Sequence, residues 1–135
     1  MAHKFRELMV WQRAMEFVAH IYALSRDFPP NELYGLTSQL RRAAVSIPLN
    51  IAEGSGSSSS PDFARFLDIS LKSTYETMTA LELAERLGYC RHDQIAPLLN
   101  EADEIAAMLV GLSKKIRSTA TLHESLEEYS VVSDD

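Results

Sequence analysis

The stretch that decides the fold is LLNEADEIAAMLVGLSKKI, residues 98–116. Its apolar residues recur at alternating intervals of four and three, at Leu98, Ala102, Ile105, Leu109, Leu112 and Ile116. This mean interval of 3.5 residues keeps one side of a helix apolar along its whole length, as in helices that pack side by side in a bundle. We therefore predict a helix over residues 92–117 that packs along other helices.

Three more segments have helical periodicity and clear ends, at about residues 7–27, 32–53 and 60–87. Pro29 ends the first, because proline lacks an amide hydrogen and disfavours helix in the residue before it. Asn31 is the predicted N-cap of the second helix. Residues 54–60, GSGSSSS, are the clearest loop of the chain. Gly88 suits the left-handed residue that closes the third helix.

Four helices joined by short connections predict an all-α fold, an antiparallel up-and-down four-helix bundle. Residues 1–117 form the predicted bundle domain, and residues 118–135 form an acidic tail. The tail has no Lys or Arg from Thr119 onward and holds five acidic residues, which leaves the rest of the chain at a net charge of −1. We expect the tail to be a mobile, solvated end rather than a binding segment.

The first helix has one apolar line and a surplus beside it. The line consists of Leu8, Trp11, Met15, Val18 and Tyr22, at three- and four-residue spacing, and it is the predicted core face. Trp11 is its predicted anchor in the core. The surplus consists of Phe17, Ile21 and Leu24 together with Val10.

The second helix also has two apolar sides. Its predicted core line consists of Leu33, Leu36, Leu40, Ala43, Ile47 and Ile51, and Pro48 within it predicts a kink. Nearly opposite lie Tyr34, Val45, Leu49 and Ala52. Scattered surface apolar residues are common. Second apolar faces on two helices nevertheless favour association between subunits, with these four residues as the predicted oligomer interface.

A polar strip separates the two apolar sides of the second helix, and it consists of Arg42, Ser46, Asn50 and Glu53. Two interpretations stay open. The strip can be structural, with Asn50 and Glu53 capping chain ends near Gly54. Alternatively, it can belong to a recognition surface whose possible nucleic-acid contacts are Arg41, Arg42 and Arg65.

The residue types that carry catalysis or bind cofactors do not form a recognisable motif. The four histidines share no metal-ligand spacing, and Cys90 has no C-x-x-C partner. The glycine pair at 54 and 56 lacks the third glycine and the lysine of a phosphate-binding loop. Acidic pairs such as Glu101 and Glu104 suit solvated helix faces. The sequence therefore predicts a protein that is not an enzyme and has no catalytic, metal or cofactor site.

The chain also lacks the features of a membrane protein. No apolar run approaches the roughly 18 residues that span a bilayer. One cysteine cannot form an internal disulfide, which suits a reducing compartment. We expect a cytoplasmic protein with no membrane partner.

Residues 36–54, LTSQLRRAAVSIPLNIAEG, closely resemble the signature of the 23S rRNA intervening-sequence protein family, also called the four-helix bundle protein family. Residues 5–12, FRELMVWQ, and residues 85–89, ERLGY, strengthen the resemblance, which covers about residues 5–117. It implies a bundle that assembles into a ring, typically a homopentamer. The family is related to accessory proteins of diversity-generating retroelements, in which a basic ring surface binds nucleic acid.

Two functional hypotheses follow. The first is a non-enzymatic oligomer that serves as a scaffold or as an accessory protein associated weakly with RNA or DNA. The alternative is a protein–protein interaction module without nucleic-acid binding. Neither hypothesis identifies a further protein partner.

Overall fold

A computed structural model describes the backbone of residues 4–133 and the side chains of residues 4–119. Two short 3₁₀ helices, η1 (Lys4–Glu7) and η2 (Pro30–Glu32), accompany four α-helices. The α-helices are α1 (Met9–Ser25), α2 (Leu36–Ser55), α3 (Ser60–Arg86) and α4 (His92–Ser133). Over residues 4–133 the structure contains no β-strand, so the all-α prediction is confirmed.

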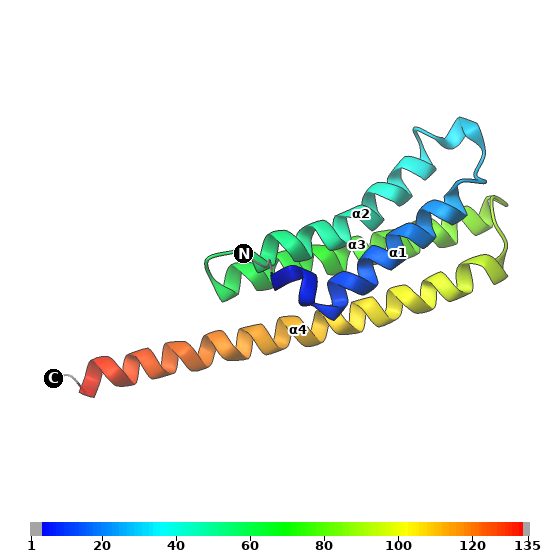
Figure 1. The fold of residues 1–135 in the computed structure, drawn as a ribbon. Coiled ribbons are helices and arrows are strands. Elements are labelled where there is room, and N and C mark those ends of the chain that lie inside the picture. The colour runs from blue at the N-terminus through cyan, green and yellow to red at the C-terminus, as the bar shows by residue number, and fades with distance from the viewer. Residues whose placement is uncertain (1–3, 134–135) are drawn as a thin grey trace.

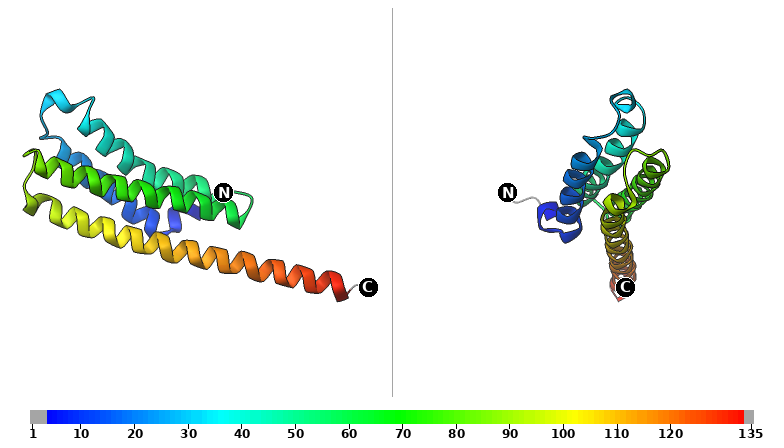
Figure 2. Two further views of the ribbon diagram at one scale, coloured as in Figure 1. Left: turned by 180° about the vertical axis from the view of Figure 1, so that it is seen from behind. Right: turned by 90° about the vertical axis from the view of Figure 1, so that its right-hand side faces the viewer.

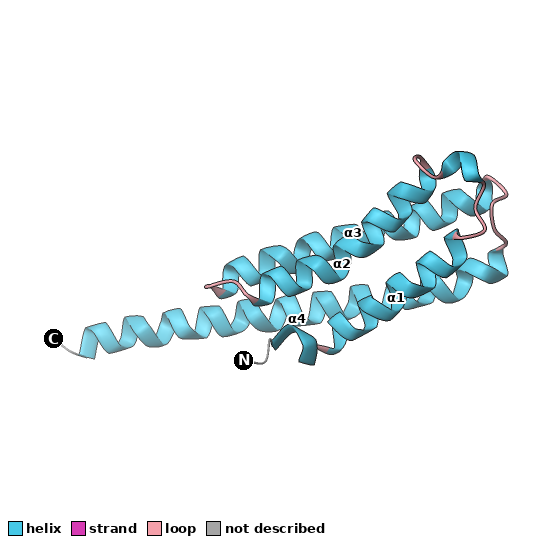
Figure 3. Ribbon diagram, turned by 45° about the horizontal axis from the view of Figure 1, so that its top comes forward, coloured by secondary structure: helices cyan, strands magenta, loops and turns pink. Residues whose placement is uncertain are grey.

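The helices form an antiparallel bundle in which each packs against its neighbour in the chain, and α1 also packs against α4 (Figure 1). The loops lie at the two ends of the bundle (Figure 3). Seen from behind, α4 continues well past the other helices (Figure 2, left). The 42 residues of α4 span about 63 Å, whereas the 27 residues of α3 span about 40 Å.

The sequence predicts that the fourth helix ends near Arg117. In the structure, α4 continues to Ser133. No glycine or proline follows Gly111, so nothing in the local sequence breaks the helix there. The acidic residues of the predicted tail lie outside the side chains that the structure describes. The division of the chain after residue 117 stays a prediction.

The side of α1 that faces the core differs from the prediction. It consists mainly of the apolar residues beside the predicted core line, and not of the line itself. Phe17 and Ile21 are completely buried, together with Val10 and Ala14. Trp11 is only partly buried and packs edge-on against Phe5, with 5.2 Å between ring centroids. The predicted line instead follows the edge of the core, where Met15 and Tyr22 are exposed.

The core line of α2 is as predicted from Leu36 onward, but its first turn differs. Asn31 caps nothing, because the chain forms η2 first and α2 begins only after Gly35. Leu33 is therefore exposed. The helix is continuous through Pro48, and its ribbon is bowed (Figure 1). Its far end includes Gly54, which was predicted to lie in the loop.

Gly54 is buried where α2 crosses the start of α3. A Cβ atom at this position would lie 2.7 Å from Cβ of Phe66 and 2.9 Å from Cδ1 of Phe63. Further along the contact, the Ser70 hydroxyl donates a 2.9 Å hydrogen bond to the Ile47 carbonyl. Thr74 and Thr77 donate to carbonyls one turn back in α3, so these buried hydroxyls are satisfied locally.

Both ends of α3 are set by its sequence. Ser59 is the N-cap of α3, and its hydroxyl accepts a 3.3 Å hydrogen bond from the Asp62 amide. At the other end Gly88 has a φ of +80°, and the Tyr89 amide donates back to the Ala84 carbonyl. This is the predicted left-handed closure, which glycine adopts without strain.

Substitutions of two helical glycines should have opposite effects. Gly54→Ala should lower the free energy of unfolding by about 1–3 kcal/mol, because the new methyl group overpacks the contact with Phe63 and Phe66. Gly111→Ala should raise it by about 0.5–1 kcal/mol, because no atom lies within 4 Å of the added carbon and alanine favours helix. Urea unfolding followed by circular dichroism measures both changes. A Gly54→Ala protein at least as stable as the wild type would contradict the close packing.

Candidate functional site

An open groove of about 1050 Å³ runs between α2 and α3 on the outside of the bundle. Its α2 side consists of residues between Leu36 and Ser46, and its α3 side of residues between Ile69 and Leu83. Small side chains, among them Ala43, Ser73 and Ala80, line it alongside longer ones. Because these side chains are short, the two helices leave a depression along their contact.

The predicted polar strip follows this groove and continues beyond it. The Asn50 amide donates to both the carbonyl and the hydroxyl of Ser46, each at 2.9 Å. The Ser73 hydroxyl donates to the same Ser46 oxygen at 2.8 Å, so this network joins α2 to α3. Asn50 therefore bonds one turn back within α2 and does not make the predicted cap of a chain end. Glu53 is exposed and lies outside the groove lining.

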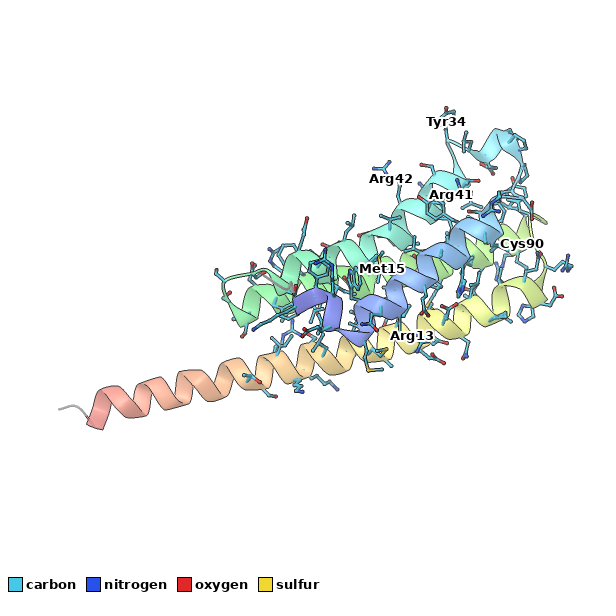
Figure 4. The ribbon with its side chains drawn as sticks, in the orientation of Figure 1. Arg13, Met15, Tyr34, Arg41, Arg42 and Cys90 are labelled. Atoms are coloured by element: carbon cyan, nitrogen blue, oxygen red, sulfur yellow. The ribbon has the colours of Figure 1, made fainter. Side chains whose placement is uncertain are left out.

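The charged side chains of the groove are Arg42, Lys72 and Glu76. Among the side chains of residues 4–119, none of the three has an ion-pair partner within 4.0 Å. Arg42 and Lys72 are exposed, and Arg42 projects outward from α2 (Figure 4). The groove therefore combines apolar surface with two cationic groups and one anionic group that solvent can reach.

The other two predicted nucleic-acid contacts are engaged within the chain. The Arg41 Nε donates a 2.8 Å hydrogen bond to the Ser25 hydroxyl, and its guanidinium lies 4.5 Å from the ring centroid of Tyr22. Arg65 donates to one carboxylate oxygen of Asp62 from two nitrogens, at 3.0 and 3.1 Å. The structure thus separates Arg42 from Arg41 and Arg65, although the sequence grouped them.

The predicted oligomer interface is divided between two places. Tyr34 precedes α2 and is 94% exposed at the end of the bundle (Figure 4). Val45, Leu49 and Ala52 lie on α2 itself, with Leu49 57% exposed. Val45 lies one turn after Arg41, whose stacking on Tyr22 shows that this side of α2 borders α1.

Exposed apolar residues of α1 adjoin that side of α2. Arg13 and Met15 leave α1 on opposite sides (Figure 4): Arg13 pairs with Glu104 of α4, and Met15 is 47% exposed. Tyr22 is two turns after Met15 and is 40% exposed. We call the set Met15, Tyr22, Val45, Leu49 and Ala52 the apolar strip.

Groups able to bind a metal ion or act as a nucleophile do not gather in the described part of the chain. No cluster of three or more His, Cys, Asp or Glu residues occurs there. Cys90 is partly buried, and burial, reinforced by Glu85, raises the pKa of its thiol, which disfavours the reactive thiolate. The Glu101 and Glu104 carboxylates pair with His20 and Arg13 across the contact between α1 and α4.

Glu32 links the start of α2 to the turn between α3 and α4. Its carboxylate accepts a 2.7 Å hydrogen bond from the Tyr89 hydroxyl and a 3.3 Å bond from the Leu36 amide. These bonds, that from Tyr89 foremost, lower the pKa of Glu32. The same carboxylate raises the pKa of Tyr89. Glu32 thereby takes the capping role that the sequence analysis gave to Asn31.

The segment that resembles the family signature, residues 36–54, corresponds to α2, which forms one side of the groove and carries three of the five residues of the apolar strip. The sequence model of the 23S rRNA-intervening sequence protein family matches residues 6–111. The chain belongs to this family. A comparison with curated proteins gives no match.

A solved structure supports the same assignment. It is a protein of unknown function from the S23 ribosomal protein family of Bacteroides thetaiotaomicron, 32% identical to this chain. The match has a TM-score of 0.72 and covers 78% of this chain and 99% of the other. Neither the family model nor the solved structure indicates an enzyme family. Over the part of the chain that the structure describes, none of the helices contains an apolar stretch that could span a bilayer.

Sequence reasoning missed the α3 side of the site, including Lys72, Tyr75 and Glu76. The outer positions of α3 carry charged residues that are typical of a solvated helix face. A usable signal was present in Ser73 and Ala80, because small residues on an outward face leave room beside a neighbouring helix.

The hydrogen bond between Tyr89 and Glu32 should make stability depend on pH. The pKa of Glu32 is lower in the folded chain than in the unfolded one, so its contribution is present near neutral pH and is lost as the pH falls below about 4.5. Tyr89→Phe should therefore reduce the loss of unfolding free energy between pH 7 and pH 3. Urea titrations at several pH values measure this difference. Tyr75→Phe, at an exposed tyrosine, is the matched control and should follow the wild type.

Proposed function

We propose that the protein is a non-enzymatic, homo-oligomeric scaffold that assembles through the apolar strip. The observation that carries this proposal is the exposure of Leu49, Met15 and Tyr22 on adjoining sides of α2 and α1. An apolar surface that crosses two helices is costly to leave in water, and an interface with another subunit would remove it. The family resemblance implies a ring, typically of five subunits.

The absence of catalytic machinery from the described residues is consistent with a scaffold. Several charged groups pair across helix contacts, as Arg13 does with Glu104 and Arg117 with Asp68. The groove holds hydroxyl groups, but Ser46 and Ser73 are bonded to each other and have no adjacent histidine to act as a base. These contacts give the residues that they join a role in packing the bundle.

Leu49→Glu should dissociate the oligomer and leave the helical content unchanged, because Leu49 points away from the core and a carboxylate there would be buried in the interface. Sedimentation equilibrium should give a mass several times 15.1 kDa for the wild type and close to that value for the variant. Glu53→Gln, on the same helix outside the strip, should remain oligomeric. A wild-type chain that sediments as a monomer at micromolar concentration would refute the proposal.

A second candidate function is weak association with RNA. The observation that favours it is that Arg42 and Lys72 have no ion-pair partner among the side chains of residues 4–119. Solvent-accessible cations of this kind neutralise phosphates, and an oligomer repeats them in every subunit. The chain outside the acidic tail has a net charge of −1. Because this part is nearly neutral, we expect its binding to RNA to be modest. This candidate concerns one surface of the scaffold and is compatible with the first.

RNA binding should fall steeply with salt and should depend on Arg42 and Lys72. Fluorescence anisotropy with an rRNA hairpin at low salt should show weaker binding for Arg42→Ala/Lys72→Ala. Arg65→Ala should have a smaller effect, because Arg65 is already paired with Asp62. Deleting residues 119–135 should strengthen binding by removing five negative charges. If neither the full-length nor the shortened protein binds the hairpin, the RNA function is wrong and the scaffold remains.

A further inference from the structure

Arg41 lies beside the apolar strip and is held in one orientation by two contacts with α1. Its Nε atom donates a 2.8 Å hydrogen bond to the buried Ser25 hydroxyl, which itself donates to the Ile21 carbonyl at 2.7 Å. Its guanidinium lies 4.5 Å from the ring centroid of Tyr22, a residue of the strip. A planar group that is stacked on a ring and bonded at Nε has little freedom to rotate. Arg41 is therefore a preorganised cation where α2 faces α1 (Figure 4).

Most of the hydrogen-bonding capacity of Arg41 is unused in the described part of the chain. A guanidinium has N–H groups on Nε, Nη1 and Nη2, and the bond to Ser25 uses only the one on Nε. The groups on Nη1 and Nη2 form no hydrogen bond with residues 4–119. No carboxylate of these residues lies within 4.0 Å of the guanidinium. Because Arg41 is only partly buried, solvent reaches this side chain in the single chain.

Covering the apolar strip would change the surroundings of Arg41. The core of an interface excludes water, and a guanidinium that loses its water without gaining an acceptor weakens the assembly. The strip of a second copy supplies no carboxylate, because its residues are Met15, Tyr22, Val45, Leu49 and Ala52. The acceptor therefore lies outside the strip of that copy.

We propose that Arg41 anchors the oligomer by binding a carboxylate of a second copy of the chain. This anchor rests on the proposed assembly through the apolar strip. The paired N–H groups of Nη1 and Nη2 match the two oxygens of a carboxylate, which also balances the positive charge. Exposed carboxylates without an ion pair among residues 4–119 are available on the second copy, among them Glu82 of α3 and Asp103 of α4.

The stacking of Arg41 on Tyr22 also suits an anchor. Arginine and tyrosine are enriched among the few residues that carry most of the binding energy of an interface. A side chain that is already fixed in the free subunit loses less conformational entropy when it binds. Arg42, the next residue of α2, lacks such contacts and lines the groove, so it offers a matched comparison.

Zero-length cross-linking of the full-length protein tests the anchor. In Arg41→Lys, a carbodiimide should join the amine at position 41 to the carboxylate that it contacts, as an amide with loss of water. Mixing isotopically light and heavy chains should show that the product joins two copies, and mass spectrometry should identify the carboxylate. Arg42→Lys is the matched control and should give much less product between copies. Cross-links from position 41 that stay within one chain, to Asp27 for example, would overturn the proposal.

Charge reversal provides a second test. Arg41→Glu should raise the dissociation constant of the oligomer roughly 30-fold or more, because it places one carboxylate against another. Changing the cross-linked carboxylate to lysine in the same chain should restore assembly, which loss of the contacts with Ser25 and Tyr22 would not allow. Arg42→Glu makes the same change in charge in the groove and should leave the dissociation constant unchanged.

Sedimentation equilibrium measures these constants, and circular dichroism checks that each variant is folded. If the wild type is an oligomer and the folded Arg41→Glu protein assembles equally well, the anchor is wrong and assembly through the apolar strip is unaffected. A wild-type monomer would refute both.

Discussion

The close approach of α2 to α3 is the contact on which the other features depend. Gly54 allows it at one end, where any side chain would collide with Phe63 and Phe66. Hydrogen bonds between the two helices stabilise it further along. The Ser70 hydroxyl donates to the Ile47 carbonyl, and the Ser73 hydroxyl donates to the Ser46 hydroxyl. Hydroxyls suit this contact because they are small enough for close packing and can satisfy their hydrogen bonds without water.

The same small residues that bring the helices together also shape the surface. Inside the bundle, Thr74 and Thr77 fill the space beside larger aliphatic residues and bond back to their own helix. Outside, Ser46, Ser73 and Ala80 leave the groove open. The groove is thus a consequence of how α2 and α3 pack, and a larger residue at Ser73 would disturb both the groove and the bundle.

The second helix separates the two surfaces to which we assign function. Neighbouring residues on a helix point about 100° apart, so Arg41 turns toward α1 while Arg42 turns toward the groove. Val45 and Ser46 repeat this division one turn later. An assembly through the apolar strip therefore leaves the groove available to RNA. Both proposals rest on surfaces and need no catalytic residue.

The sequence by itself determined the number of α-helices, the closure at Gly88 and the core line of α4. These features depend on local periodicity and on residues with strong conformational preferences, which act within a few positions of the chain. The continuation of α4 to Ser133 also depends on a local signal, the absence of glycine and proline after Gly111. The sequence analysis missed it because the acidic composition of this segment is typical of a solvated tail. Family membership likewise followed from residues 36–54.

Only the tertiary structure decided which apolar line of α1 is buried. Two adjoining lines of similar apolarity satisfy the same helical period, and the positions of α2 and α4 select Phe17 and Ile21 over Met15 and Tyr22. Tertiary contacts also made Glu32 the cap of α2, through Tyr89 57 residues away, and separated Arg42 from Arg41 and Arg65. Such outcomes depend on partners distant in the chain, and periodicity along one helix carries no information about what lies beside it.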